Sequence, residues 1–446
     1  MNDTTQTKGG FFGAIAGLIG PAAVMTAGIM GAGSTVSLVT AGCYFEYSLL
    51  WVVFLSLPVI VICQDTASRI GLISGEKGMM QIIAEQTHPA IMWFMVVPLL
   101  FTCITANIGQ LGAMTAGVSG LVNQITGEET IPSTLTVAGR FWFFISLAVL
   151  CILINATGGY KRTEKILSYL LFVVLISFAI VAFKAFLNFE EVKKMFQGLI
   201  PAIPADVEAE SGAVRKGFVS FAGIFGGGVA ATAILSFPYF TTEGGYTKEQ
   251  VRGQFVKHLI LLGGVFGFYS CILLIAGGYA LHPLEGSAGF EGAGEMGQAL
   301  GVLGPFGPPL FSFGLMICAY TTLIVVAQLA AYFVLDCLGM NWRFEKGNIR
   351  FKYFFGIFIL APAVMGPAWE YPELLKVVIS MVVNTLVAPL AIVMIVWLIN
   401  KKAFAGDLKA SPLRNLFLAY SVGVACFTCI RSAIGFFNSI GGLLEG

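Results

Sequence analysis

The feature that most constrains this chain is a succession of apolar stretches, each close to the roughly 20 residues that a helix needs to cross a bilayer. Only 11% of the residues are charged, against about 25% in soluble domains. These observations predict an all-α integral membrane protein and exclude a soluble globular one. We expect eleven transmembrane helices, at about residues 12–42, 46–70, 90–118, 139–157, 165–188, 217–242, 255–281, 305–338, 351–368, 374–400 and 412–440.

The polar connectors divide these predicted helices into two halves. The longest connector is residues 189–216. We therefore expect one transmembrane domain over residues 1–446, with a first repeat at about 12–188, a second at about 217–400 and an extra helix at 412–440. Lys and Arg gather in the connectors on one side, which marks that side as cytoplasmic. The pattern predicts a plasma (inner) membrane protein with its amino terminus in the cytoplasm and its carboxyl terminus outside.

Two apolar stretches are interrupted by residues that disfavour a helix. The first interruption is Gly31-Ala-Gly-Ser34, where each glycine costs roughly 1 kcal/mol relative to alanine. The second is Ile234–Pro238, where the proline removes a backbone donor. Close-packed glycines and a simple kink are the alternative explanation, but broken helices at matching places in two halves are typical of transporter sites. We therefore expect a mid-membrane substrate site formed by Gly31, Ala32, Gly33, Ser34, Ile234, Leu235, Ser236 and Tyr239.

Ionisable residues are scarce within the predicted helices. Asp65, His258 and Asp336 fall near predicted cytoplasmic ends, where we expect their side chains to reach interfacial water. Arg431 is the deepest predicted cation, and the sequence leaves open whether it pairs with carbonyls or lies at the outer interface. Neutral polar residues occupy the helix interiors, where they can join helices by hydrogen bonds or line an aqueous path: Asn107, Gln110, Tyr320, Thr321, Thr322, Gln328 and Asn384.

The sequence indicates neither an enzyme nor a bound cofactor. Most of the nine cysteines lie in apolar stretches, and Cys426-Phe-Thr-Cys429 lacks the further ligands that a zinc site requires. The glycines at 226–228 lie inside an apolar stretch, unlike a phosphate-binding loop. A net charge of +1 gives no basis for nucleic-acid binding. The expected partners are a small solute, with or without a coupling ion, and the lipid bilayer; the oligomeric state is left open.

The chain resembles the Nramp (SLC11) family of metal transporters in its first two predicted helices. The similar segments are Gly20-Pro21 followed by Gly31 to Ser34 and Ala41-Gly42, then Leu49-Leu-Trp51 and Gln64 to Gly75, and later Gly158 to Lys165. The order and length of the apolar stretches follow the family along most of the chain. The resemblance implies the LeuT fold, in which two inverted repeats of five helices each carry an unwound first helix.

The departures from the family pattern fall on its functional residues. The resemblance implies metal ligands in an Asp-Pro-Gly-Asn motif and a Met-Pro-His motif, a later His in the sixth helix, and an acidic pair tied to proton transfer in the third. This chain has Gly31-Ala-Gly-Ser34, Ile234-Leu-Ser236, Thr241, and Asn107 with Gln110 at the corresponding places. We therefore assign no metal-ligating side chain, and place Asn107, Gln110, Thr241, Tyr320 and Asn384 along the pathway or at a coupling position.

Three functions remain open after this comparison. The missing carboxylate and thioether favour a secondary transporter of a small organic solute, such as an amino or carboxylic acid, because soft metals select soft ligands. The alternative is a divalent cation transporter for Mg²⁺ or Mn²⁺ with an altered site, in which the ion keeps part of its water. A membrane protein that does not transport is the third hypothesis, since a fold does not determine a function.

Overall fold

The computed structural model describes residues 28–131, 135–156, 160–208, 214–283, 292–345 and 347–444. The predicted first stretch is therefore described only from residue 28, and the motif at 158–165 only from residue 160. The helices are α3 (Ala32–Phe45), α4 (Leu50–Ser74), α5 (Met79–Gln86), α6 (Pro89–Thr126), α7 (Val137–Ala156), α8 (Tyr160–Phe186), α9 (Phe189–Gln197), α10 (Gly217–Gly228), α11 (Ala231–Glu243), α12 (Val251–His258), α13 (Phe266–Ala280), α14 (Ala293–Met296), α15 (Gly307–Cys337), α16 (Ile349–Met365), α17 (Glu373–Asn400), α18 (Lys402–Ala405) and α19 (Pro412–Leu444).

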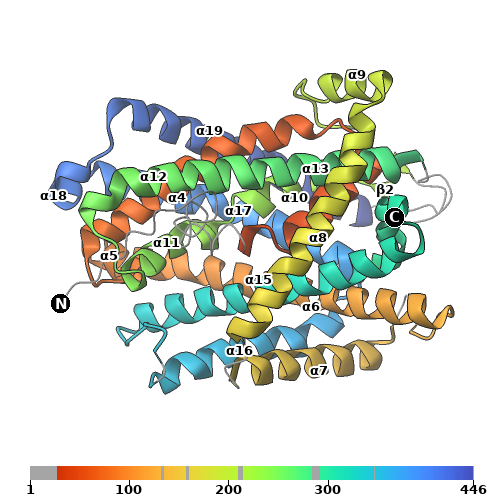
Figure 1. The fold of residues 1–446 in the computed structure, drawn as a ribbon. Helices are drawn as coiled ribbons and strands as arrows, with labels where there is room; N and C mark the ends of the chain where they lie inside the picture. Colours follow the sequence, from red (N-terminus) through yellow and green to blue (C-terminus); the bar gives the residue numbers. More distant parts are fainter. Residues whose placement is uncertain are drawn as a thin grey trace, which may run out of the picture.

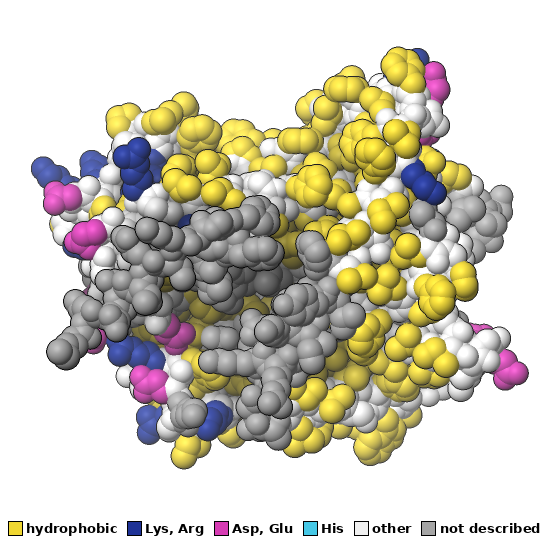
Figure 2. All heavy atoms as spheres, viewed as in Figure 1, with side chains coloured by type: hydrophobic (Ala, Val, Ile, Leu, Met, Phe, Trp, Pro, Cys, Tyr) yellow, Lys and Arg dark blue, Asp and Glu magenta, His cyan; other side chains and the backbone are white. Residues whose placement is uncertain are grey.

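The long helices confirm the predicted class of membrane protein. Within the described ranges, nine helical spans are long and apolar enough to cross a membrane, and ten if the sharply bent pair Val173–Phe186 and Phe189–Gln197 counts as one. In Figure 1 most of the long helices run roughly alongside one another, and α8 crosses them steeply. Figure 2 shows hydrophobic side chains over much of the visible face, with Lys and Arg mainly at the end that holds α5, α12 and α18. The orientation of this end toward the cytoplasm remains a prediction.

The connector between the predicted halves has its own secondary structure. It contains α9, bent 101° from the end of α8, and a short antiparallel hairpin of β1 (Val207–Glu208) and β2 (Val214–Arg215). Lys194 of α9 forms ion pairs with Glu191 and with Glu46 at the end of α3. The connector is therefore attached to the first half of the chain as well as joining the second.

The first helix is broken where the glycines predict it. Gly28 and Ile29 are helical, Met30 forms a turn, and Gly31 is extended, with φ −78° and ψ −173°, before α3 begins at Ala32. The Gly31 backbone breaks the helix, while its carbonyl accepts the first bond of α3 from the Thr35 amide at 3.0 Å. The predicted interruption of this stretch is thus present in the structure.

The second break lies at Val229 and Ala230. The predicted position of this break, Ile234–Pro238, is therefore wrong by about one helical turn. α10 ends at Gly228, after three successive glycines whose backbones are the least restrained. Pro238 instead lies inside α11. Gly71 of α4 packs directly against the Pro238 backbone, where an added Cβ would lie 2.7 Å from the Pro238 Cα.

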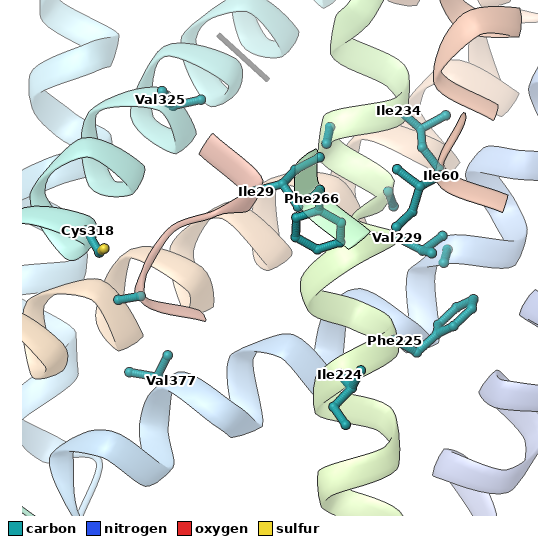
Figure 3. Close-up of a cluster of buried hydrophobic side chains, with 14 of the residues drawn as sticks. Ile29, Ile60, Ile224, Phe225, Val229, Ile234, Phe266, Cys318, Val325 and Val377 are labelled. Atoms are coloured by element: carbon teal, nitrogen blue, oxygen red, sulfur yellow. The ribbon is translucent and has the colours of Figure 1, made fainter. Parts of the chain in front are cut away.

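The two breaks lie against the same long helices. α6 packs on both α15 and α17, while α3 packs on α10, α13 and α17. Figure 3 shows Ile29 at the first break and Val229 at the second, with Ile60 and Phe266 nearby. Ile60 and Phe266 both contact the backbone position of Gly228. This apolar packing surrounds the end of α10.

Candidate functional site

A small cavity lies between the two breaks. Its walls come from the first break, from the second break, and from α6, α15 and α17, and its volume is about 50 Å³. A buried water needs roughly 10–15 Å³ of such volume, so the cavity holds roughly three to five water-sized groups. Its lining residues are Gly28, Ile29, Gly31, Gly33, Ser34, Ala106, Gln110, Gly227, Ala230, Thr232, Ala233, Thr322, Val325, Val326, Leu329, Met381 and Asn384.

Two amide side chains in this cavity have polar atoms that find no partner among the residues that the structure describes. Both side-chain atoms of Gln110 are buried and unpaired, as is Oδ1 of Asn384. The only hydrogen bond of the Asn384 side chain among the described residues is a long one, from Nδ2 to Sδ of Met381 at 3.9 Å. Buried polar atoms are nearly always paired, so these groups indicate water or a polar ligand in the cavity.

Ser34 joins the two breaks by hydrogen bonds. Its hydroxyl lies 2.5 Å from the Ile29 carbonyl in the first break and 3.2 Å from the Gly227 carbonyl in α10. Gly227 makes this approach possible, because an added Cβ would lie 3.0 Å from Ser34 Oγ. The carboxyl end of α10 thus points carbonyl groups toward the cavity, an arrangement that favours a cation.

Three lining residues have site chemistry that the sequence did not assign to the site. Met381 brings a thioether to Gly33, where an added Cβ would lie 2.7 Å from Sδ. Thr232 and Thr322 bring hydroxyl groups. Thr322 belongs to the neutral polar set recognised in the sequence, but the face of α15 on which it lies depends on packing. The inference that the soft thioether ligand is missing is therefore wrong for the cavity as a whole.

Several predicted site residues are buried in the core and do not line the cavity. Ala32, Ile234 and Leu235 are fully buried apolar residues. Ser236 donates to the Ala233 carbonyl inside its own helix at 2.8 Å. Because the second break precedes α11, the segment from Ile234 to Ser236 presents side chains to the packed interior instead of unwound backbone to the cavity.

Tyr239 also lies away from the cavity. Its ring stacks on Tyr332, with centroids 5.1 Å apart, and its hydroxyl donates to Asp336 at 2.6 Å. The same carboxylate accepts the Met80 amide at 2.7 Å, at the start of α5. Tyr239 therefore joins α11 to α15 and α5, and the structure does not support its predicted contact with the substrate.

The remaining predicted pathway residues join helices. Asn107 donates to the Phe358 carbonyl of α16 at 2.7 Å; this carbonyl has no helical partner because Pro362, four residues on, lacks an N–H. Asn155 Nδ2 donates to the Tyr320 hydroxyl at 3.2 Å, and the hydroxyls of Thr241 and Ser68 form a hydrogen bond at 3.2 Å. Of the five predicted pathway residues, only Gln110 and Asn384 line the cavity.

The prediction that Asp65, His258 and Asp336 reach interfacial water is wrong. Each is only 1% exposed. Asp65 pairs with Arg414 at 2.6 Å, with Arg69 at 2.9 Å and with His258 at 3.2 Å. The carboxylates are paired inside the bundle because neighbouring helices supply their donors.

Arg431, whose place the sequence left open, is exposed on α19, with its guanidinium 6.0 Å from the centre of the Phe427 ring. Among the described residues, no charged side chain lines the cavity, and no cluster of three His, Cys, Asp or Glu residues suited to a metal is present.

The fold resembles those of solved membrane transporters. The manganese transporter of Eremococcus coleocola, in complex with an aromatic bis-isothiourea compound, superposes with a TM-score of 0.68 at 17% identity, covering 98% of this chain and 91% of that one. MhsT in complex with L-phenylalanine superposes with a TM-score of 0.53 at 17% identity, covering 92% and 97%. The two broken helices around the cavity and these likenesses define a multi-pass membrane protein of the LeuT fold.

The chain belongs to the Nramp family, because the family's sequence model, described as natural resistance-associated macrophage protein-like, matches residues 22–434. The divalent metal cation transporter MntH of Lacticaseibacillus casei is 22% identical over 192 residues, which are 43% of this chain but only 38% of that protein. The MntH of Caldanaerobacter subterraneus is 20% identical over 425 residues, covering 93% of this chain and 91% of that protein. The resemblance seen in the sequence is confirmed.

Proposed function

We propose that this protein transports a divalent metal cation that keeps part of its hydration shell, with Mg²⁺ preferred over Mn²⁺. The relatives that match over most of their length are named divalent metal cation transporters. We therefore propose a divalent cation as the substrate in place of an organic solute, which the comparisons do not favour. The likeness to MhsT carries no weight for the substrate, since one fold serves many substrates.

The unpaired amides of Gln110 and Asn384 are the observation that carries the proposal. They face a cavity of about 50 Å³, which has room for a cation with a few waters. The amide oxygens can bind the ion directly or accept hydrogen bonds from its waters, because the ion makes those waters better donors. Water alone can also satisfy these atoms, so the test must measure the ion itself.

The chemistry of the lining favours a hard cation with retained water. The available oxygens are backbone carbonyls, hydroxyls and side-chain amides, without a carboxylate among the described lining residues. Complete dehydration of a divalent ion is costly without negative charge to replace the water. Mg²⁺ gives up its waters reluctantly and binds through few direct ligands. The thioether of Met381 is a softer donor, so Mn²⁺ is the second cargo that the lining can accept.

The transport cycle follows from the same arrangement. Alternating access moves one group of helices against another around a fixed central site, and the predicted halves at 12–188 and 217–400 are the units that we propose to be related as inverted repeats. No titratable side chain lines the described cavity, so we propose that the ion is not exchanged for a proton bound there. We place the protein in the plasma membrane, with a cytoplasmic amino terminus.

Flux measurements on purified protein test this proposal. Proteoliposomes containing a Mg²⁺-sensitive or Mn²⁺-sensitive dye report uptake, and empty liposomes give the background. We expect saturable Mg²⁺ uptake that is reduced at least tenfold by Asn384→Leu and retained in Asn107→Leu. Absence of divalent flux from a folded protein, or uptake of amino or carboxylic acids instead, would refute the proposal.

A further inference from the structure

The first break has no room for a side chain at Gly31. A Cβ built on its backbone overlaps the hydroxyl oxygen of Thr322 and lies 2.9 Å from the Thr322 Cβ. The obstruction comes from α15, the helix that carries Thr322. Both residues line the cavity. Thr322 therefore occupies the space that a longer residue at position 31 would use.

The Thr322 hydroxyl is held in a defined position. Its oxygen lies 2.9 Å from the Cys318 carbonyl one turn earlier in α15, and 3.4 Å from the Gly28 carbonyl in the first break. The shorter contact is the usual hydrogen bond of a helical threonine to the carbonyl four residues back. A hydroxyl that donates its one proton in this way still has oxygen lone pairs for a ligand.

From this geometry we infer that Thr322 determines cation selectivity by two effects of the same hydroxyl. It supplies a neutral oxygen to the hydrated cation, at the place where a side chain of residue 31 would otherwise reach. It also keeps position 31 a glycine, which excludes a carboxylate from this side of the cavity. The inference rests on the proposed divalent cation transport and names the residue that keeps the site neutral.

The neighbouring threonine provides a matched control. Thr321 also donates to the Cys318 carbonyl, at 3.0 Å, but it does not line the cavity. A valine at either position removes one hydroxyl and keeps nearly the same volume. The comparison therefore separates loss of a ligand from loss of a hydrogen bond within α15.

The first experiment measures Mg²⁺ binding by calorimetry on purified protein. We expect Thr322→Val to weaken Mg²⁺ binding at least tenfold, Thr322→Ser to stay within threefold of the parent protein, and Thr321→Val to match the parent. Equal binding by the two valine variants overturns the inference while leaving the proposed function intact. A folded parent protein that binds no divalent cation overturns both, so the two failures are distinguishable.

The second experiment tests the steric effect by thermal unfolding, without relying on the metal. Gly31→Ala should lower the unfolding temperature in the parent protein and lower it much less in a Thr322→Gly background, because the glycine opens the space. Thr321→Gly controls for the loss of helix stability that any glycine causes in α15. In the Thr321→Gly background, Gly31→Ala should still lower the unfolding temperature. Additive effects in both backgrounds would show that the two residues do not compete for space.

The same pair of positions predicts how selectivity can be changed. Gly31→Asp combined with Thr322→Gly should strengthen Mn²⁺ binding at least tenfold relative to Thr322→Gly alone, since a carboxylate then faces the ion. Gly31→Asp alone should not do so, because Thr322 blocks it. Mn²⁺ binding that is equally strengthened with and without Thr322→Gly would contradict the exclusion effect.

Discussion

Replacing Gln110 by methionine should stabilise the protein without metal and weaken its response to metal. The two residues have similar shape, but methionine removes both unpaired amide atoms of Gln110. An unsatisfied buried polar group costs about 1–3 kcal/mol. Water in the cavity offsets part of this cost, so we expect the low end, a gain of about 1 kcal/mol in the free energy of unfolding without metal.

The metal reverses this advantage. A ligand present at 100 times its Kd stabilises a protein by about 2.7 kcal/mol, and a tenfold loss of affinity reduces this to about 1.4 kcal/mol at the same concentration. The loss of about 1.3 kcal/mol cancels the gain from removing the unpaired atoms. The Gln110→Met variant should therefore unfold at a higher temperature than the parent protein without Mg²⁺, and at nearly the same temperature in saturating Mg²⁺.

Asn107 is the matched control for this experiment. It lies on the same helix and is equally buried, but its Nδ2 pairs with the Phe358 carbonyl at 2.7 Å. Asn107→Leu also removes one unpaired atom, Asn107 Oδ1, but it leaves the Phe358 carbonyl without a donor. We therefore expect no net gain in stability and an unchanged response to Mg²⁺. Thermal unfolding in detergent, followed by tryptophan fluorescence, measures both variants. A Gln110→Met variant that is less stable without metal and shows the parent's full Mg²⁺ shift would refute the reasoning.

Three further predictions concern selectivity, coupling and the conformational cycle. Met381→Leu should weaken Mn²⁺ and Cd²⁺ binding several-fold and leave Mg²⁺ binding nearly unchanged, because only soft ions gain from the thioether. Calorimetry with each metal measures these affinities, and an equal loss for all three metals would contradict the prediction. Uptake should change less than about twofold between pH 6 and 8, because Gln110 and Asn384 do not titrate there; a steep rise toward pH 6 in proteoliposome flux would point to a proton-binding residue elsewhere. Tyr239→Phe removes the hydrogen bond to Asp336 and should change the transport rate without changing equilibrium Mg²⁺ affinity; an altered Kd in calorimetry would place Tyr239 at the site after all.

The class of protein could be predicted from the sequence because it follows from local properties. Apolar stretches of membrane-spanning length can only form helices in lipid, and their order already resembles the Nramp family. The break before Ala32 was also predictable, since Gly31 and Gly33 weaken a helix whatever surrounds them. Neutral residues at Gln110 and Asn384 were recognisable as candidates for the same reason: polar groups inside apolar helices need partners.

The composition of the cavity depended on tertiary structure. The sequence placed the second break at Ile234–Pro238, but Pro238 lies inside α11, and the helix before it ends earlier, at Gly228. Asn107 and Gln110 are similar amide residues one turn apart on α6. Asn107 donates to a carbonyl of α16 that Pro362 leaves without a helical partner, whereas Gln110 faces the cavity. Helix packing alone decides which face meets which neighbour.

The most consequential contact joins residues far apart in the chain. The glycine at position 31 shows only that no side chain is present there. Nothing near it in the sequence indicates which residue fills the space that a side chain would occupy. The fold brings Thr322 of α15 to that space and Met381 of α17 to Gly33. Local sequence thus determined where the backbone opens, because glycine acts on its own helix. Tertiary packing determined which oxygen and sulfur atoms face the opening, because those atoms belong to other helices.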